Sequence, residues 1–273
     1  VLGRELTAIA REKAGIVSKE GARRRGASGT VVISAQQAPE VAGLLEETVG
    51  REGQLVVYGR QMEATILRHG VDGLDMTVQG MRGRYDGLHL PLIGRHQAAN
   101  ATLASTAVEA LAGDGVPYEA VRRGIAGVRW PGRLEVVAGQ PLVLLDGAHN
   151  PQALQALHDT LEELWPNQPI HVLVGMSSDK SVHAISACLA PRAASMVCTR
   201  SCHPRAADPA HLARELAASH RRIEVVEDPV DAYTYLVNRA GPEDVVVIAG
   251  SLFLVGELRS VVRKRAQSVE VSS

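Results

Sequence analysis

From residue 141 onward, a short apolar stretch followed by an amphipathic stretch occurs five times in succession. The apolar stretches have the character of buried strands, and they are PLVLLD (141–146), PIHVLVG (169–175), ASMVCTR (194–200), RIEVVED (222–228) and DVVVIAG (244–250). Two of the amphipathic stretches begin with a capping residue followed by proline, at Asn150 and at Asp208. Strands that alternate with helices in this way predict a mostly parallel sheet that is covered on both faces.

The first 130 residues follow a less regular pattern. Helical spacing of apolar residues is found before Lys13 and near 38–50, 95–112 and 117–127, and apolar strands are expected in TVVISA (30–35) and LVVYG (55–59). Three stretches alternate apolar and polar residues, which predicts antiparallel strands: ATILRHG (64–70), LDMTVQG (74–80) and YDGLHLPL (85–92). The prolines and glycines after residue 129 mark a junction, so we predict two α/β domains, residues 1–138 and 139–273.

The overall composition excludes several classes of partner. The chain has 29 basic and 30 acidic residues, without a basic patch of the kind that binds nucleic acid. It contains no run of 18 apolar residues, so no membrane span is expected. Its three cysteines cannot all pair with one another, which favours a reducing cytoplasm. We therefore expect a cytoplasmic protein whose partners are small molecules.

The first helix places a lysine on its apolar face. At 100° per residue, Leu2, Leu6 and Ile9 share one stripe, and Lys13 projects into it. In one interpretation the lysine stem lies along the apolar face, the ammonium reaches water, and Gly15 ends the helix as a left-handed cap. In the other, the amine is held in a desolvated site that lowers its pKa, so that the neutral form is available for chemistry.

The decapeptide LLDGAHNPQA (144–153) joins an apolar strand to a helix. Asp146 ends the strand, so its carboxylate is expected at the carboxyl edge of a parallel sheet, where open α/β folds bind ligands. A carboxylate in this place can accept hydrogen bonds from both hydroxyls of a ribose, and the helix N-terminus beside it suits an anion. The alternative is that Asp146 and Asn150 only cap the helix.

Two stretches outside the strand ends also contain candidate binding residues. Arg133 follows a Pro-Gly turn in WPGRLE (130–135), where its guanidinium can bind phosphate oxygens or form a surface ion pair. Asn100 lies among alanines on a helix, where its amide can donate to and accept from the edge of a nucleobase.

Polar residues also follow two other apolar strands. Asp179 and Lys180 come after the strand at 169–175, and Ser251 comes after the strand at 244–250. Because parallel strands end at the same sheet edge, these side chains are expected to converge with Asp146 on one rim.

Six motifs follow one another along nearly the whole chain: LGRELTAIAREKAGIV, LIGRHQAANATLA, WPGRLEVV, LLDGAHNPQA, GMSSDK and AGSLFLVGELR. Together they resemble folylpolyglutamate synthase and its relative dihydrofolate synthase, members of the Mur ligase superfamily. The resemblance implies the later part of a central ATPase domain, followed by a Rossmann-like domain with a mostly parallel sheet. It also implies a ligase that uses ATP and Mg²⁺ to convert a substrate carboxylate into an acyl phosphate, which the amino group of L-glutamate then attacks. The carboxylate would belong to a folate, to dihydropteroate or to both.

The resemblance further implies roles for individual residues. Lys13 matches a lysine that reacts with CO₂ to form a carbamate, an anion able to bind Mg²⁺. Asn100 matches an asparagine on the adenine side, Arg133 an arginine that contacts phosphate, and Asp146 an aspartate that binds ribose. His149 matches an active-site histidine. Lys13 and His149 are therefore the predicted catalytic residues.

Four further residues are assigned to the substrate side of the same site. Arg205, in HPRAADP (203–209), lies where relatives have a similar arginine, and its exact role stays open. Asp179, Lys180 and Ser251 complete this group.

The loop motif G-x-x-G-K-S of related ATPases does not occur in this sequence. We therefore expect the chain alone not to turn over ATP, and its first domain to expose an unpaired sheet edge and apolar surface. The full-length protein is expected to be a monomer. Two alternatives are a Mur ligase acting on a peptidoglycan precursor and a non-catalytic nucleotide-binding module.

Overall fold

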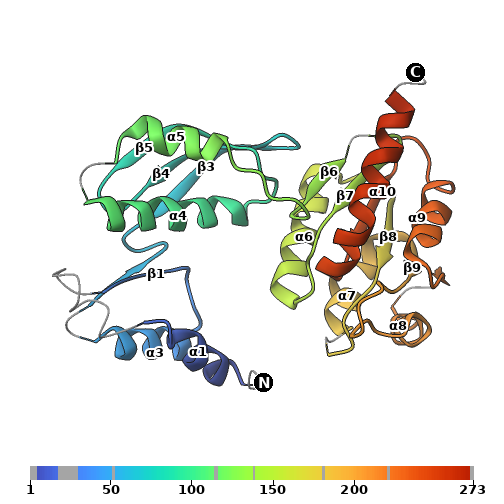
Figure 1. The fold of residues 1–273 in the computed structure, drawn as a ribbon, viewed down its shortest axis with the longest axis horizontal. Coiled ribbons are helices and arrows are strands. Elements are labelled where there is room, and N and C mark those ends of the chain that lie inside the picture. The colour runs from blue at the N-terminus through green and yellow to red at the C-terminus, as the bar shows by residue number, and fades with distance from the viewer. Residues whose placement is uncertain are drawn as a thin grey trace. The chain divides into compact units, whose positions relative to one another are not determined.

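The computed structural model describes residues 5–17, 30–50, 53–113, 116–137, 139–179, 182–219 and 222–270. The chain divides into two compact units, each of which is described by itself (Figure 1). The first contains most of the chain up to Val128, and the second contains Arg129 onward together with the short segments 70–73 and 92–95. The boundary predicted between residues 138 and 139 stays a prediction.

The first unit combines helices with two small sheets. Its elements are α1 (Leu6–Ala14), β1 (Val31–Ser34), α3 (Pro39–Val49), β2 (Gln54–Val57), β3 (Glu63–Gly70), β4 (Gly73–Gln79), β5 (Arg84–Leu90), α4 (His96–Ala112) and α5 (Tyr118–Ala126). Strands β1 and β2 form a parallel two-stranded sheet, and β3, β4 and β5 form a three-stranded sheet in which β4 and β5 are antiparallel. The antiparallel arrangement predicted from the alternating pattern is therefore confirmed for β4 and β5.

The turn between β4 and β5 is organised around a buried carboxylate. Glu109 of α4 is only 1% exposed, and its oxygens accept hydrogen bonds from the backbone N–H of Gly83 (3.0 Å), the N–H of Arg82 (3.2 Å) and the hydroxyl of Tyr85 (2.9 Å). Burial, together with this carboxylate, raises the pKa of Tyr85 to about 12, so the hydroxyl stays a donor. Glu109 thus joins α4 to the hairpin.

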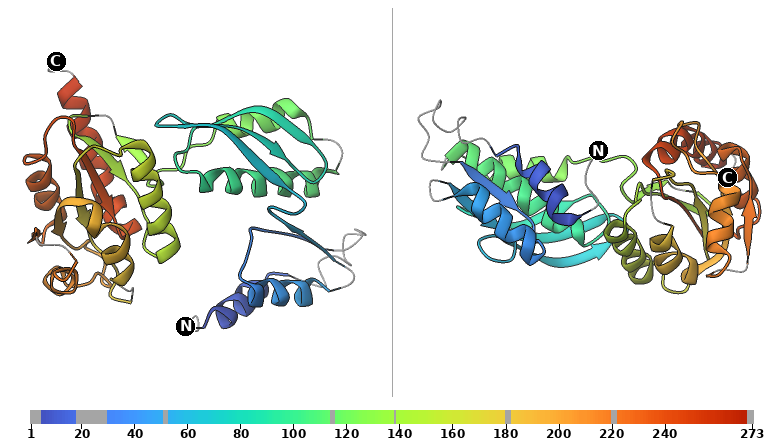
Figure 2. Two further views of the ribbon diagram at one scale, coloured as in Figure 1. Left: turned by 180° about the vertical axis from the view of Figure 1, so that it is seen from behind. Right: turned by 90° about the horizontal axis from the view of Figure 1, so that it is seen from below.

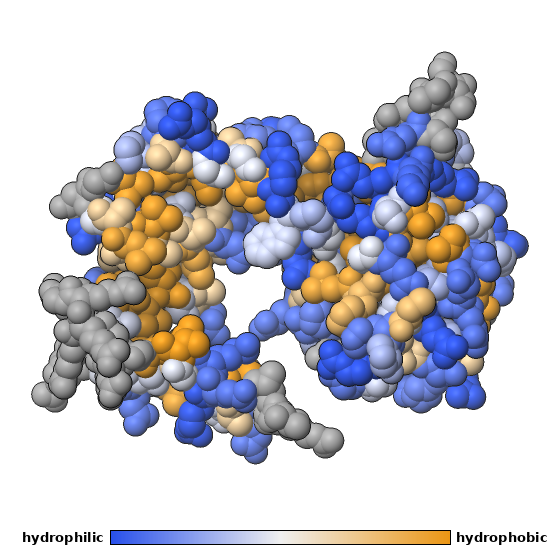
Figure 3. All heavy atoms as spheres, in the orientation of Figure 1, coloured by the Kyte–Doolittle hydropathy of each residue, from blue (hydrophilic) through white to orange (hydrophobic). Residues whose placement is uncertain are grey.

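The first unit exposes apolar side chains, as the sequence predicts. Leu111 of α4 is 85% exposed, and Leu6, Ile16 and Val108 are also exposed. Figure 3 shows hydrophobic residues gathered over the region of α4 and β1. None of the helices in the described ranges combines the length and apolar character needed to span a lipid bilayer.

The second unit is an α/β domain with the alternation predicted from the sequence. Its elements are β6 (Glu135–Val137), β7 (Leu142–Leu145), α6 (Pro151–Leu164), β8 (Ile170–Val174), α7 (His183–Cys188), the 3₁₀ turn η2 (Ala190–Arg192), β9 (Ala193–Cys198), α8 (Pro209–Leu216), β10 (Ile223–Val225), α9 (Pro229–Val237), β11 (Val245–Ala249) and α10 (Leu252–Glu270). The six strands are ordered β10-β9-β8-β11-β7-β6. The five predicted strands are parallel, whereas β6, which the sequence did not predict as a strand, is antiparallel to β7.

Helices cover both faces of this sheet (Figure 2). Side chains of α6, α7 and α8 pack in one apolar cluster with residues such as Leu144 and Val172, and side chains of α9 and α10 pack in the other with residues such as Leu145 and Leu173. The helix that follows β7, α6, therefore lies on one face of the sheet, and the helix that follows the neighbouring strand β11, α10, lies on the other face. Adjacent strands whose connections diverge in this way mark the place where open α/β sheets bind ligands, at the carboxyl ends of the strands.

At the opposite, amino-terminal edge of the sheet, a histidine joins three strands. Nδ1 of His171 lies 2.8 Å from Oγ of Ser195, and its Nε2 lies 2.9 Å from Oδ2 of Asp244. Asp244 also accepts a hydrogen bond from the N–H of Gly241 (2.7 Å). Burial alone would raise the pKa of Asp244, but the hydrogen bonds from Gly241 and His171 outweigh it and hold this pKa below its ordinary value of 3.8.

This arrangement predicts a pH-dependent contribution to stability. Because the pKa of Asp244 is lower in the folded chain than in the unfolded chain, its stabilisation is present above the unfolded pKa and is lost as the pH falls through the folded pKa. We expect Asp244→Ala to lower the free energy of unfolding by about 2 kcal/mol at pH 7 and by progressively less as the pH falls below 3.8. Thermal melts of both proteins across this pH range test this, and an equal difference at every pH would contradict it.

Candidate functional site

The loops that follow the parallel strands of the second unit are joined by backbone hydrogen bonds. The N–H of Gly250, after β11, donates to the carbonyl of Ala148, after β7 (2.9 Å), and the N–H of Gly175, after β8, donates to Ala249 at the end of β11 (3.3 Å). Gly250 has a φ of 97°, and a methyl group on it would lie 2.6 Å from the carbonyl oxygen of Gly175. Convergence of these strand ends on one rim, as predicted, is therefore confirmed.

Asp146 lies at the centre of this rim. It is 8% exposed, and each oxygen of its carboxylate accepts one backbone hydrogen bond, Oδ2 from Leu134 (2.8 Å) and Oδ1 from Ala148 (2.7 Å). Each oxygen keeps a further lone pair for a ligand. Burial raises the pKa of Asp146 above 3.8, although the two backbone donors and nearby Arg133 oppose this shift.

The cap proposed as an alternative is formed by only one of the two residues. Oδ1 of Asn150 accepts a hydrogen bond from the N–H of Ala153 (2.9 Å), so Asn150 is the N-cap of α6. Asp146 makes no contact of this kind with α6, and its carboxylate contacts the turn before β6 instead. Asn150 already accepts the hydrogen bond of the Ala153 N–H, and Pro151 has no backbone N–H. The N-terminus of α6 therefore has fewer free N–H groups to donate to an anion than the sequence suggests.

The turn at residues 130–135 is fitted to the end of β7. The carbonyl of Gly132 accepts from the N–H of Gly147 (2.9 Å), and the N–H of Gly132 donates to Glu135 (2.9 Å). Leu134 adopts a φ of 43°, a conformation rare for a residue with a side chain, and this directs its N–H to Asp146 while its side chain is buried in the core. Glu135 also forms an ion pair with Arg259, in which Oε2 of Glu135 lies 2.8 Å from Nε of Arg259.

Arg133 lies beside the same strand end. A methyl group added to Gly147 would lie 2.8 Å from Nη1 of Arg133 and 2.2 Å from Cδ2 of Leu252, so both side chains lie closely over this glycine. The guanidinium carbon of Arg133 is 6.0 Å from the ring centre of Trp130. The structure therefore brings Arg133 and Asp146 together, as a site for phosphate and ribose requires.

His149 and Ser251 also lie on this rim. Nδ1 of His149 is 2.8 Å from the carbonyl oxygen of Gly147. Because a carbonyl only accepts, Nδ1 carries the proton, and Nε2 of the neutral ring is left as an acceptor. The hydroxyl of Ser251 accepts from the N–H of Phe253 (3.2 Å), which makes Ser251 a cap of α10.

The remaining substrate-side residues lie on the neighbouring loops. The carbonyl of Arg205 accepts from the N–H of Ser178 (2.8 Å), and this bond joins the loops after β8 and β9. Asp179 and Arg205 are exposed, and Lys180 lies outside the described residues. The ring of His203, on the loop after β9, stacks on the ring of Phe253 in the first turn of α10, with centres 3.7 Å apart, and the sequence analysis did not single out either residue.

The two candidates in the first unit are both exposed. Asn100 of α4 donates from Nδ2 to Oε1 of Gln97 (2.9 Å). Lys13 is exposed, whereas Ala14 is the buried residue of α1, so the desolvated environment proposed for the amine is wrong in this structure. The reason is that, among the described residues, the stripe around Lys13 is only partly covered, since Leu6 is 52% exposed. Gly15 has a φ of −58°, so the predicted left-handed cap is also wrong.

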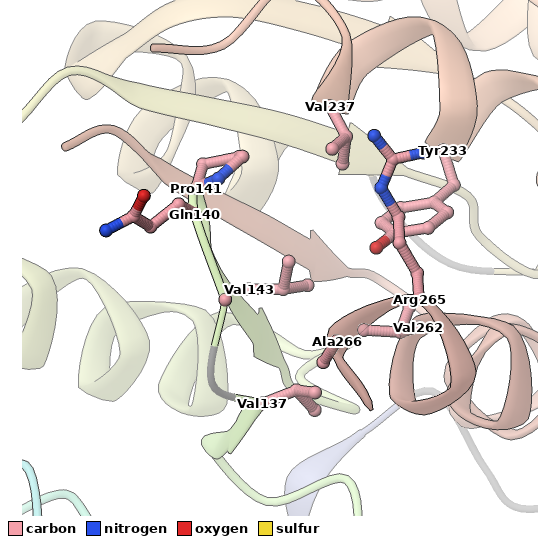
Figure 4. A pocket seen from close by; sticks show the side chains of 10 residues that line it. Val137, Gln140, Pro141, Val143, Tyr233, Val237, Val262, Arg265 and Ala266 are labelled. Atoms are coloured by element: carbon pink, nitrogen blue, oxygen red, sulfur yellow. The ribbon is translucent and has the colours of Figure 1, made fainter. Parts of the chain in front are cut away.

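A small cavity in the second unit lies away from the rim. Its volume is about 20 Å³, room for roughly one water molecule, and Tyr233 and Arg265 lie at one side of it (Figure 4). Among the described residues, no group of three His, Cys, Asp or Glu side chains is placed to hold a metal ion. The strongest candidate for a ligand site in this unit is therefore the rim around Asp146.

Comparisons with known proteins find relatives over nearly the whole chain. Residues 132–252 match the family described as Mur ligase, glutamate ligase domain. The chain is 36% identical, over 95% of its length, to the dihydrofolate synthase/folylpolyglutamate synthase of Mycobacterium tuberculosis, and it spans 57% of that protein.

Two solved structures give the same result. The fold matches M. tuberculosis folylpolyglutamate synthase complexed with ADP, with a TM-score of 0.85 and 31% identity, over 96% of this chain and 60% of that one. It also matches E. coli FolC in complex with DHPP and ADP, with a TM-score of 0.80 and 27% identity, over 97% of this chain and 58% of that one. The predicted fold class, an α/β chain with part of a Mur-ligase ATPase domain before a Rossmann-like domain, is confirmed.

Proposed function

Because the chain belongs to the family of folylpolyglutamate and dihydrofolate synthases, we propose that it is part of an ATP-dependent ligase that adds L-glutamate to folate, to dihydropteroate or to both. The observation that carries this proposal is the buried carboxylate of Asp146 at the carboxyl edge of the sheet, beside the guanidinium of Arg133. A nucleotide needs both an acceptor for its ribose hydroxyls and a cation for its phosphates, and this rim supplies them side by side.

The contacts of Asp146 fit a ribose. Its two oxygens are already oriented by Leu134 and Ala148, so a bound sugar would meet a fixed pair of acceptors and no side-chain rotation would be needed. We assign ribose binding to Asp146, phosphate binding to Arg133, and adenine recognition to the amide of Asn100. ATP would supply the phosphoryl group that activates the substrate carboxylate.

The proposed role of Lys13 has a different basis from the roles of the rim residues. Because Lys13 is exposed, CO₂ can reach its amine. For the same reason, burial does not favour the neutral form of this amine. The proposal that Lys13 is carbamylated and binds Mg²⁺ therefore rests on its match to the EKAGI motif of the family.

The acceptor nitrogen of His149 gives this residue its proposed catalytic role. Nε2 is available to take a proton, and the amino group of L-glutamate must lose one when it attacks an activated carboxylate. Arg205, together with Asp179, Lys180 and Ser251, is proposed to bind the substrates on the neighbouring loops. The unpaired state of all three cysteines supports a cytoplasmic location, and we propose a monomer.

A chimera tests the proposed activity. In this chimera, the M. tuberculosis protein supplies the sequence that precedes its region of similarity to this chain, and this chain supplies the remainder. We expect ADP release that requires both a folate or dihydropteroate and L-glutamate, while the chain alone stays at background because it has no G-x-x-G-K-S loop.

Three outcomes would contradict this account. Turnover by the chain alone would overturn the prediction that it is inactive. A folded chimera that used a nucleotide-linked muramyl substrate instead of a folate would support the alternative of a peptidoglycan-precursor ligase. Binding of ADP without any ligase activity in the chimera would support the non-catalytic module.

A further inference from the structure

A second cavity lies in the first unit, at the carboxyl ends of β1 and β2. Its volume is about 170 Å³, and it is lined by Ser34, Ala35, Gln36, Gln37, Ala42, Leu45, Glu46, Leu55, Val57 and Arg60. Lys13 and Asn100, the residues of this unit that the proposed function uses, do not line it. The cavity is therefore built from residues other than those assigned to the proposed ligase site.

The size of this cavity limits what it can hold. A protein cavity of roughly 150 Å³ accommodates benzene, which has six heavy atoms. A cavity of about 170 Å³ that is open to solvent therefore suits a small molecule of about eight heavy atoms, part of which stays in water.

The lining combines an apolar wall with three neutral polar side chains and two opposite charges. Ala42 and Leu45 of α3 and Leu55 and Val57 of β2 are only half-buried, so they still have apolar surface that a ligand can cover. Arg60 and Glu46 stand at the same cavity. The ligand must therefore satisfy an apolar wall, a cation and an anion together.

The two charged side chains are free to turn toward a ligand. Nη1 of Arg60 is 3.9 Å from Oε1 of Glu46, and the two side chains are 64% and 61% exposed. An exposed ion pair at this separation is weak, so a ligand that carries both charges can replace it by two closer pairs.

The loop that carries Arg60 is well ordered by its own hydrogen bonds. The N–H of Gly59 donates to the carbonyl of Met62 (2.7 Å), and the N–H of Val57 donates to the side chain of Gln61 (2.8 Å). Gly59 has a φ of 80°, and a methyl group on it would lie 2.6 Å from Nε2 of Gln36. The backbone position of Arg60 is thus set before any ligand binds.

We propose that this cavity binds the zwitterion of a small aliphatic α-amino acid such as valine. The ligand carboxylate pairs with Arg60, its ammonium pairs with Glu46, and its side chain covers the apolar wall. An acidic side chain on the ligand is disfavoured because it would bring a third charge against the apolar residues, so this site is distinct from one for the substrate L-glutamate.

Binding of L-valine to the full chain, followed by NMR of backbone amides, tests the proposal without nucleotide or folate. We expect saturable shifts at residues 34–37, 42–46 and 57–60, with a Kd below about 1 mM. Arg60→Gln and Glu46→Gln are each expected to weaken binding at least tenfold, whereas Glu47→Gln, an exposed neighbour outside the lining, serves as the matched control and leaves it unchanged.

Analogues of valine that carry only one charge test the pairing with Arg60 and the pairing with Glu46 separately. Isobutylamine and isovalerate keep the side chain and the α-carbon of valine with only one of the charges, and we expect each to bind at least tenfold more weakly than valine. Equal binding of either analogue would overturn recognition of the zwitterion. The absence of saturable shifts with valine in a folded protein would overturn the site itself, and it would leave the result of the ligase assay unaffected.

Discussion

Replacement of Asp146 by asparagine is expected to weaken ADP binding by about 100-fold. The carboxylate oxygens already accept from Leu134 and Ala148 and have one lone pair each left for the ribose hydroxyls. An asparagine has one acceptor oxygen in place of two, so its NH₂ group must face a backbone N–H or a ribose hydroxyl. Loss of one ribose hydrogen bond, and of the negative charge that strengthens the other, costs about 3 kcal/mol, which corresponds to the stated loss of affinity.

Isothermal titration calorimetry with ADP and Mg²⁺ measures this effect. Asp159→Asn is the matched control, because Asp159 is an exposed aspartate on α6 of the same unit, and it is expected to leave affinity unchanged. A circular dichroism spectrum like that of the parent protein shows that the variant is folded. Unchanged ADP affinity in folded Asp146→Asn would exclude this carboxylate as a ribose ligand.

Glu109→Ala is expected to destabilise the first unit by about 3 kcal/mol, because it leaves the buried hydroxyl of Tyr85 and two backbone N–H groups without their charged acceptor. Hydrogen exchange of the β4 and β5 amides should then quicken by about 100-fold, if these strands open with the unit. The exposed Glu119 of α5, which pairs only with Arg122, provides the control Glu119→Ala, with an expected effect within about 0.5 kcal/mol. An unchanged exchange rate in Glu109→Ala would show that the hairpin does not depend on this carboxylate.

Much of the second unit follows directly from its sequence, because the signals there are local. Runs such as DVVVIAG identify the buried strands, and Asn150 and Asp208 were recognised as caps from the proline that follows each of them; both cap geometries are present. Once the strands are parallel, the placement of Asp146 and Ser251 on one rim follows from topology.

The contacts that complete the site could not be found in this way. Leu134 has a positive φ although it is not a glycine, and in this conformation its N–H donates to Asp146. Strand β6 has three residues beside prolines and glycines, too few for a periodic pattern. Glu109 looks like a surface residue of a helix until the hairpin it contacts is known.

Lys13 shows the limit of reasoning from one helix. Its apolar stripe left both burial and exposure of the amine open, because burial depends on what packs against the stripe, and α1 packs chiefly on α3 while Lys13 is exposed. Sequence periodicity identifies which face of a helix is apolar. It does not identify the partner that covers this face.

The most direct test of the central claim is NMR titration of the isotope-labelled chain with ADP and Mg²⁺. The account predicts saturable shifts of the backbone amides of Leu134, Gly147 and Ala148, which surround Asp146, and their loss in Asp146→Asn. Saturable ADP binding that leaves these three amides unshifted would contradict it.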